Sequence, residues 1–227
     1  MKAEAIIVAA GQGKRMGGKI DKIFLEVAGT PIIVHTWRRF EAIDDIQKII
    51  FVIRAGLEDD FRALINRYGL KKPFQFVEGG KERQDSVWNG LSALSPECEI
   101  VTIQDGARPC TPTEIIKKAM SIALENGASV LAQKVTDTIK VSSDGHSVDQ
   151  TLERSLLWSV QTPQVFKPQV IKKAIQAAID KGVKLTDDTA ACELIDQKVF
   201  LVECPMPNPK ATTPSDLPYI EMILNRS

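Results

Sequence analysis

The feature of the sequence that most constrains its fold is a regular alternation of short β-branched runs with amphipathic segments. Strands are expected at 5–10, 48–53, 74–77, 100–103, 128–135 and 198–203, and helices at 31–41, 57–68, 83–94, 113–125, 168–181 and 214–224. Thr111 or Thr113 can cap the helix at 113–125. Parallel strands need long crossover connections, which are usually helices. The alternation therefore predicts a three-layer α/β/α, Rossmann-like fold on a mostly parallel sheet.

Residues 136–161 break this alternation. Stretches of β character lie on either side of the turn sequence Ser142-Ser143-Asp144-Gly145, which predicts a hairpin arm that projects from the sheet. An isolated hairpin buries too little apolar surface to be stable unless something covers it. We therefore expect a single domain over 1–227 with an arm over 136–161 through which two chains form a homodimer.

Composition excludes several classes of protein. The 227 residues carry 29 basic and 29 acidic side chains, so a general nucleic-acid-binding surface is not expected. We find neither a membrane-spanning run, which needs about 20 apolar residues, nor a signal peptide, so a cytoplasmic protein without membrane contact is expected. The four cysteines form no CxxC pair and fit a reducing compartment. The only histidines, His35 and His146, are far apart, which argues against a histidine-rich metal site.

A glycine- and lysine-rich loop follows the first expected strand. Its small residues let backbone N–H groups approach an anion: Ala9, Ala10, Gly11 and Gly13. Four cations and one acid give the loop a local charge near +3: Lys14, Arg15, Lys19, Lys22 and Asp21. Ligands of open α/β sheets lie beyond the carboxyl ends of the strands, so the loop predicts a polyphosphate site. A solvated loop with incidental lysines is the alternative.

Two familiar phosphate-binding motifs are incomplete in this loop. The dinucleotide pattern GxGxxG matches at Gly11 and Gly13 but has Met16 in place of its third glycine. The P-loop pattern GxxxxGK[ST] ends at Lys19, and Ile20 replaces the hydroxyl that would hold Mg²⁺. An NAD enzyme and a P-loop NTPase are therefore set aside.

The loop and the segments after it carry a resemblance to a known family. The run AAGQGKRM at 9–16 followed by Lys22 is similar to the signature of sugar-phosphate nucleotidyltransferases, as is LEVAGTPI at 25–32. Further segments match in order: GGKERQDSV at 79–87, DGARP at 105–109, DTIK at 137–140, QTPQ at 161–164, LTDD at 185–188 and NPKAT at 208–212. Together they resemble the 2-C-methyl-D-erythritol 4-phosphate cytidylyltransferase family over about residues 5–217.

The resemblance implies an activity as well as a nucleotidyltransferase fold. A cytidylyl group would pass from CTP to 2-C-methyl-D-erythritol 4-phosphate with release of pyrophosphate, in non-mevalonate isoprenoid precursor biosynthesis. A cytidylyltransferase acting on ribitol 5-phosphate or another alditol phosphate is the alternative within this class. A nucleotide-binding module without turnover is the alternative from another class.

The reaction joins two anions, so cations and positioned dipoles must supply most of the stabilisation of the transition state. The candidates for the α-phosphate and the leaving pyrophosphate are Arg15 and Lys22, and the resemblance adds Lys210. Asp105 ends the fourth expected strand, where it could lie near Mg²⁺ on the triphosphate or accept bonds from substrate hydroxyls. An ordinary capping carboxylate is the other interpretation of Asp105.

The remaining candidates bind the two substrates. For CTP they are the small residues of the loop, with Ser86 and the backbones of Gly80 and Lys81 facing cytosine. Ser86 could instead be a helix N-cap. For the sugar phosphate the resemblance implies Arg108, Thr138, Arg154 and Thr186. Of these, Thr138 and Arg154 would reach across the dimer, although Thr138 could simply be a strand residue.

The chain departs from the family's common pattern at three positions. Asp21 replaces the usual proline before the catalytic lysine, which could loosen the loop or place a carboxylate beside Lys22. Lys81 replaces a common aspartate, so a side-chain contact to the nucleotide from this position is in doubt. Gly106 replaces alanine, a mild change.

Overall fold

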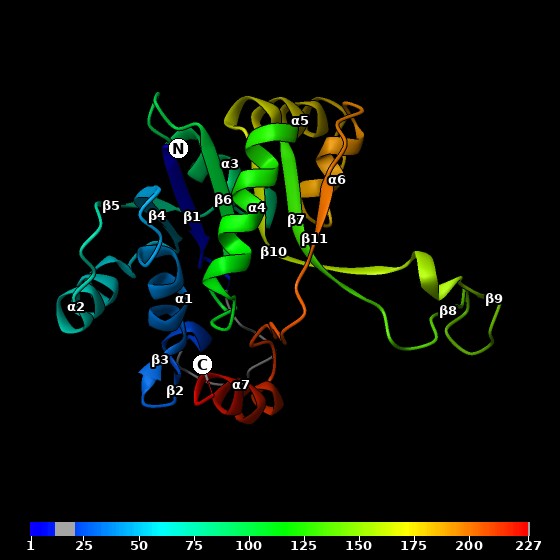
Figure 1. Ribbon diagram of the computed structural model, residues 1–227, viewed down its shortest axis with the longest axis horizontal. Coiled ribbons are helices and arrows are strands. Elements are labelled where there is room, and N and C mark those ends of the chain that lie inside the picture. The colour runs from blue at the N-terminus through cyan, green and yellow to red at the C-terminus, as the bar shows by residue number, and fades with distance from the viewer. Residues whose placement is uncertain (12–20, 227) are drawn as a thin grey trace.

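A seven-stranded sheet forms the centre of the protein (Figure 1). The structure is a computed structural model, and it describes residues 1–11 and 21–226. The strands lie in the order β11-β7-β10-β6-β1-β4-β5. Their bounds are β1 Ala3–Val8, β4 Ile46–Ile53, β5 Phe74–Glu78, β6 Ile100–Asp105, β7 Ala128–Lys134, β10 Trp158–Phe166 and β11 Phe200–Glu203. β10 is antiparallel to β6 and β7, and the other pairs are parallel, which confirms the mostly parallel sheet.

Helices cover both faces of the sheet, as the alternation predicts. In β4, Ile49 and Phe51 face one core, whereas Ile50 and Val52 face the other. The first core is closed by α1 (Ile32–Glu41), α2 (Glu58–Tyr68) and α4 (Thr113–Asn126). The second is closed by α3 (Arg83–Ser92), α5 (Pro168–Asp180) and α6 (Asp188–Glu193). The three-layer α/β/α architecture is therefore confirmed.

The expected helix cap at Thr111 or Thr113 is wrong, and so is the alternative interpretation of Ser86 as a cap. α4 starts after Pro112, and the buried hydroxyl of Thr111 instead donates to Asn208 Oδ1 at 3.0 Å, while Thr113 is already helical. α3 starts after Glu82, whose side chain forms a capping box with Asp85. Ser86 lies inside the first turn of α3, so the N-cap interpretation of Ser86 does not hold. In both helices, tertiary or neighbouring groups displace the cap that the residue type alone suggests.

Shorter elements surround the lower end of the sheet. The last expected helix divides into a 3-10 turn, η4 (Pro214–Asp216), and α7 (Leu217–Leu224). α7 packs on the small hairpin of β2 (Glu26–Val27) and β3 (Thr30–Pro31), where Val27 and Ile220 share a third apolar cluster. Another 3-10 turn, η2 (Lys22–Phe24), precedes this hairpin. Among the described helices, each is too short or too polar to cross a membrane.

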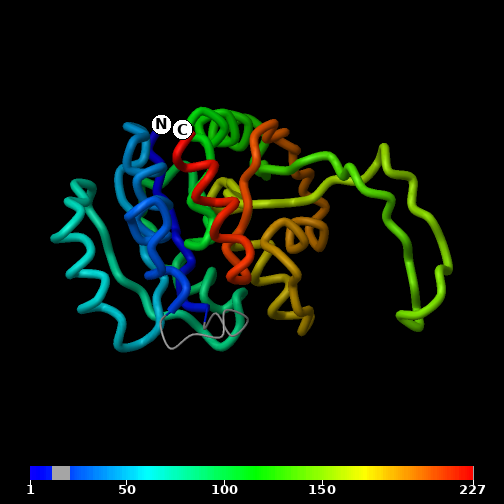
Figure 2. Tube along the Cα trace, turned by 90° about the horizontal axis from the view of Figure 1, so that it is seen from below, coloured from blue at the N-terminus to red at the C-terminus, as the bar shows by residue number. Residues whose placement is uncertain are grey.

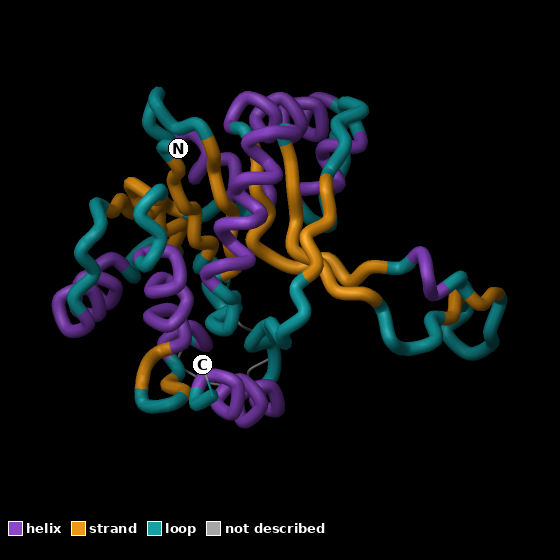
Figure 3. The backbone as a smooth tube through the Cα atoms, in the orientation of Figure 1, coloured by secondary structure: helices purple, strands orange, loops and turns teal. Residues whose placement is uncertain are grey.

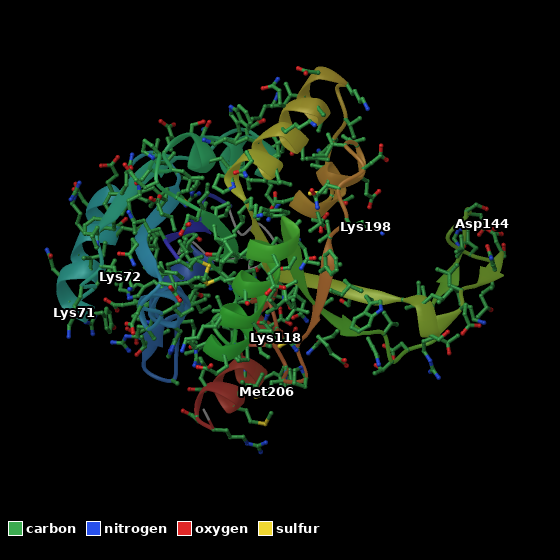
Figure 4. All side chains as sticks on the ribbon, turned by 45° about the horizontal axis from the view of Figure 1, so that its top comes forward. Lys71, Lys72, Lys118, Asp144, Lys198 and Met206 are labelled. Carbon is green, nitrogen blue, oxygen red and sulfur yellow. The ribbon has the colours of Figure 1, made fainter. Side chains whose placement is uncertain are left out.

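An arm projects from the sheet in the predicted segment (Figure 2). It contains the antiparallel pair β8 (Lys140–Val141) and β9 (Gln150–Thr151), the turn η3 (Arg154–Leu156) and the start of β10. Much of it is loop (Figure 3), and Asp144 lies at its tip (Figure 4). Val148 is 62% exposed and Leu156 76% exposed, so the arm presents apolar side chains to solvent.

Close packing of α3 on the sheet depends on Gly90. A Cβ atom there would lie 2.8 Å from Ile6 Cγ2 and 3.0 Å from Val52 Cγ2, both on buried strands. We expect Gly90→Ala to lower the free energy of unfolding by about 1 kcal/mol, because overpacking outweighs the gain in helix propensity. Urea denaturation measures this change. Ser92→Ala, at an exposed position of the same helix, is the control, and a stabilised Gly90→Ala protein would contradict the prediction.

Candidate active site

A pocket of about 590 Å³ opens at the carboxyl ends of β1, β4, β5 and β6. Backbone hydrogen bonds join the loops that leave these strands. Gly106 N–H donates to Val8 O at 2.9 Å, and Gly79 N–H donates to Ile53 O at 2.7 Å. The pocket walls are therefore continuous with the sheet, which holds them in place.

Nine of the residues predicted from the sequence line this pocket: Ala9, Ala10, Gly11, Lys22, Gly80, Lys81, Ser86, Asp105 and Lys210. Gly13 and Arg15 lie outside the described residues. Thr186 is exposed in the bend before α6 and does not belong to the pocket lining. Sequence reasoning therefore finds nine of the nineteen lining residues, from segments that are far apart in the chain.

The segment 79–86 folds tightly against the first strand. A Cβ on Gly79 would lie 2.3 Å from Ala10 Cβ, and one on Gly80 would lie 2.1 Å from Asp85 Cβ, so both positions need glycine. The buried Ser86 hydroxyl accepts a bond from Gly80 N–H at 3.0 Å and donates to Glu82 O at 3.2 Å. Ser86 thus fixes the shape of this loop, whose backbone faces the pocket.

Asp105 lies on the pocket floor, at the end of β6 as predicted. Its carboxylate is 2.7 Å from Lys210 Nζ and 3.7 Å from both Arg83 Nε and Arg108 Nε. Burial alone would raise the pKa of Asp105, but these cations outweigh burial and hold the pKa below its usual value. Asp105 is therefore a carboxylate that gathers three cations, which argues against a mere capping role.

Arg83 is a pocket residue to which sequence reasoning assigned no role. Its Nη1 and Nη2 donate to Asp188 Oδ1 and Oδ2 at 2.7 and 2.8 Å, in a bidentate pair. Burial alone would lower the pKa of Arg83, but the carboxylates of Asp188 and Asp105 raise it. The signal was present, because Arg83 and Asp188 each lie in a segment that carries the resemblance, but 105 residues separate them.

The segment 161–164 in β10 connects the loops around the pocket. Thr162 Oγ1 accepts Asp105 N–H at 3.1 Å, and Gln161 Oε1 accepts an N–H of Asn208 at 3.1 Å. Gln164 donates to Asp187 Oδ2 at 2.9 Å and accepts Asp188 N–H at 2.9 Å. The polar side chains of this segment thus fasten three separate loops to one strand.

Asn208 fixes the position of Arg108, one of the three cations around Asp105. Arg108 Nη1 donates to Asn208 O at 2.7 Å, which holds Arg108 behind Asp105. Ala211 N–H donates to Ala107 O at 2.8 Å and Lys22 Nζ donates to Ala211 O at 2.9 Å. The late loop at 208–212 therefore joins the turn that carries Lys22 to the loop after β6.

The departure at position 21 places a carboxylate against an arginine. Asp21 Oδ2 lies 2.6 Å from Arg54 Nη2, and Arg54 follows β4 and lines the pocket. Burial raises the pKa of Asp21, while the Ile23 N–H, Arg54 and Lys22 oppose the rise. Sequence reasoning considered a carboxylate close to Lys22 but did not identify Arg54.

Two predicted residues gather on the arm instead. Thr138 and Arg154 line a second pocket of about 510 Å³, and Arg154 Nη1 donates to Thr136 O at 2.8 Å. Both side chains are exposed. The structure thus brings these two residues together, but not into the lining of the first pocket of the same chain.

The donors in the main pocket fit a metal that arrives with a nucleotide. Over residues 1–11 and 21–226, no three His, Cys, Asp or Glu side chains group into a metal cluster. Mg²⁺ commonly takes one or two carboxylates together with phosphate and water oxygens. Asp105 supplies one carboxylate on the pocket floor, which fits such shared coordination and not a cage built by the protein alone.

Comparison with known proteins decides the family. The model of the 2-C-methyl-D-erythritol 4-phosphate cytidylyltransferase family matches residues 3–226. The chain belongs to this family. A protein of that name from Bacillus cytotoxicus is 46% identical over 221 residues, covering 97% of this chain and 96% of its own. One from Alkaliphilus oremlandii is 44% identical over 225 residues, covering 98% and 95%.

Solved structures of cytidylyltransferases share the fold. The 4-diphosphocytidyl-2C-methyl-D-erythritol synthase of Anaerococcus prevotii aligns with a TM-score of 0.87 at 32% identity, over 99% of this chain and 96% of its own. The 2-C-methyl-D-erythritol 4-phosphate cytidylyltransferase of Thermus thermophilus aligns with a TM-score of 0.81 at 29% identity, over the full length of both chains. The family's fold thus extends over the sheet, the pocket and the arm.

Removing Arg83 and removing Asp188 should destabilise the protein to different extents. Arg83→Met should lower the free energy of unfolding by about 3–5 kcal/mol, because a buried charge is left unpaired. Asp188→Asn should lower the free energy of unfolding less, because the charge that it leaves behind is that of Arg83. The Arg83 side chain is 32% exposed and keeps Asp105 as a neighbour, whereas the Asp188 side chain, left behind by Arg83→Met, is 2% exposed. Urea denaturation measures both changes, and equal or reversed losses would contradict this account.

The exposed pair of Lys117 and Glu114, 3.1 Å apart, provides the control for that experiment. Because both side chains are well solvated, Lys117→Met should change the free energy of unfolding by less than about 1 kcal/mol.

Proposed function

We propose that the protein transfers the cytidylyl group of CTP to 2-C-methyl-D-erythritol 4-phosphate and releases pyrophosphate, a step in non-mevalonate isoprenoid precursor biosynthesis. One observation carries the assignment of the site: Lys22, Asp105 and Lys210 meet the 79–86 loop in a single pocket at the strand ends. The family to which the chain belongs supplies the reaction, and this pocket supplies cations and backbone donors where two phosphate-bearing substrates would meet.

The cytosine lies against the 79–86 loop in this proposal. Cytosine offers an amino donor and two acceptors, which backbone carbonyls and N–H groups can match. The backbones of Gly80 and Lys81, with those of Ala9 and Ala10, are the reading groups. The Ser86 hydroxyl shapes the loop, since Gly80 N–H and Glu82 O already occupy it. Gly11 and Gly13 would approach the phosphates.

Lys22 and Arg15 act on the phosphates. An oxygen of the sugar-alcohol phosphate attacks the α-phosphorus in line, a new P–O bond forms, and the bond to the leaving pyrophosphate breaks. The attacking phosphate is already ionised, so the reaction needs no general base. Stabilisation of charge on the crowded phosphorus and on the leaving group therefore falls to positioned cations.

Asp105 and Lys210 hold the second substrate. The contact of 2.7 Å between them fixes the ammonium group of Lys210 over the pocket floor, where it can receive the attacking phosphate. Asp105 keeps an oxygen for a substrate hydroxyl or for Mg²⁺ carried by the triphosphate. When bound, Mg²⁺ would neutralise phosphate charge, and Asp105 is the residue that would hold it. Arg108 and Thr186 would add contacts to the sugar phosphate.

The arm completes the site of a neighbouring chain in a homodimer. The exposed Val148 and Leu156 support this proposal, because apolar side chains on a thin arm gain stability when a partner covers them. Thr138 and Arg154 would then reach the substrate phosphate of the partner's pocket. The four free cysteines support a reducing, cytoplasmic location.

Substrate choice is tested by measuring pyrophosphate release with CTP and each alditol phosphate in turn. We expect the highest kcat/KM with 2-C-methyl-D-erythritol 4-phosphate. Faster turnover of ribitol 5-phosphate would favour the alternative within the class. CTP binding without pyrophosphate release from either substrate would favour a nucleotide-binding module.

Mixing two inactive variants tests the shared site. Lys22→Ala should depress kcat far more than it raises KM for CTP, because its charge acts most strongly in the transition state. Arg154→Ala should raise KM for the sugar phosphate and leave KM for CTP nearly unchanged. When Lys22→Ala and Arg154→Ala chains are refolded together in equal amounts, about half of the dimers are mixed, and each mixed dimer holds one intact site. At a sugar-phosphate concentration below the raised KM of Arg154→Ala, the mixture should therefore regain about a quarter of wild-type activity. Absence of recovery would place Arg154 outside the partner's site.

A further inference from the structure

The turn that carries Lys22 is short and has few bonds of its own. η2 spans Lys22–Phe24, one turn of 3-10 helix, a conformation with poor hydrogen-bond geometry. Phe24 N–H donates to Asp21 O at 2.9 Å, and Leu25 N–H donates to Lys22 O at 3.2 Å. The core also holds the far end of the turn, because Ile23 is buried and Phe24 packs on Phe61 with ring centroids 5.5 Å apart. The Lys22 side chain itself donates to Ala211 O at 2.9 Å. The residue before the turn then fixes where the backbone of Lys22 begins.

Asp21 fastens the turn at its N-terminal end. Asp21 Oδ1 accepts Ile23 N–H at 3.4 Å, a capping bond, while Oδ2 pairs with Arg54 Nη2 at 2.6 Å. The two oxygens of one carboxylate thus have separate partners, one in the turn and one beyond β4. The capping bond is long, so the shorter contact with Arg54 does most to hold the carboxylate in place.

Arg54 is well placed to act as an anchor. It follows directly on β4, whose Ile53 is buried beside β5, so its backbone continues a central part of the sheet. The Asp21 side chain is 3% exposed, and that of Arg54 is 36% exposed. A carboxylate so well buried is costly to keep charged without a cation, and Arg54 supplies that cation at hydrogen-bond distance.

The backbone of Asp21 is consistent with a positioning role. Its φ of −62° and ψ of 131° are extended values, and the φ is close to the roughly −65° that a proline ring enforces. An aspartate can leave this conformation freely unless its side chain is held. The cap and the ion pair together restrain it here.

We propose that Asp21 and Arg54 form a latch that positions Lys22 for phosphoryl-group chemistry. Both are positioning residues, since they act through Lys22 and not on the reacting atoms. The latch rests on the proposed function, because it matters to turnover only if Lys22 acts on the phosphates. Arg54 lines the same pocket but is directed to Asp21, so its effect on CTP is indirect.

The test compares Asp21→Asn, Arg54→Met and the double variant by steady-state kinetics. Asparagine keeps the size and the capping oxygen of Asp21 but removes its charge, and methionine keeps much of the length of Arg54. We expect each single variant to lose about 10- to 100-fold in kcat, because small displacements of a catalytic group have effects of this size. KM for 2-C-methyl-D-erythritol 4-phosphate should change less than about twofold.

Coupling distinguishes a latch from two independent effects. The double variant should lose no more kcat than the worse single variant, because either change alone opens the latch. Arg54→Lys keeps a positive charge within reach of Asp21 and should recover much of the lost kcat. Arg67→Met, at an exposed position of α2, is the matched control for loss of an arginine and should keep wild-type kinetics. A single cooperative thermal transition, with its midpoint well above the assay temperature, would show that each variant is folded in the kinetic experiment.

Two results would overturn the latch. Losses that multiply in the double variant would mean that Asp21 and Arg54 act separately. A raised KM for CTP at unchanged kcat in Arg54→Met would mean that Arg54 binds the nucleotide directly. Lys22→Ala, assayed alongside, separates failure of the latch from failure of the proposed function. Unchanged kcat in Lys22→Ala contradicts the proposed role of Lys22 itself. Reduced kcat in Lys22→Ala together with wild-type kcat in Asp21→Asn contradicts only the latch.

Discussion

The buried carboxylate of Asp105 is the interaction on which the pocket depends. It attracts three cations that come from a helix, a strand-end loop and a late loop: Arg83, Arg108 and Lys210. Without a negative charge on the floor, these cations would repel one another at close range. Among the described residues that line the pocket, five are basic and three are acidic: Lys22, Arg54, Lys81, Arg83 and Lys210 against Glu78, Glu82 and Asp105. Two of the basic side chains, Arg54 and Arg83, are also paired with Asp21 and Asp188.

β10 connects segments that carry the family resemblance but lie far apart in the chain. As the antiparallel strand between β6 and β7, it brings Gln161, Thr162 and Gln164 to the strand ends where the loops emerge. Each side chain satisfies polar groups of a different loop. Four of the matching segments, at 105–109, 161–164, 185–188 and 208–212, are therefore linked by one hydrogen-bonded network, in which the loss of one member leaves buried polar groups of another without partners.

The fold and about half of the pocket lining could be predicted from the sequence, but the partners within the pocket could not. The alternation of short β-branched runs with amphipathic segments predicted the strands and helices, and the position of loops after strands predicted where Lys22 and Asp105 lie. Pairing is different, because Arg83 and Asp188 are 105 residues apart and no local pattern joins them. Likewise Thr111 reads as a helix cap in sequence, whereas its hydroxyl bonds to Asn208, 97 residues away.

The φ angle of Asp21 has a consequence for how related chains should vary. Where proline precedes the lysine, a covalent ring restricts φ, and position 54 needs no cation. Here no ring is present, and the same geometry depends on a residue 33 positions away, outside every matching segment. Positions 21 and 54 are therefore expected to vary together among relatives, with a carboxylate at the first accompanied by arginine or lysine at the second.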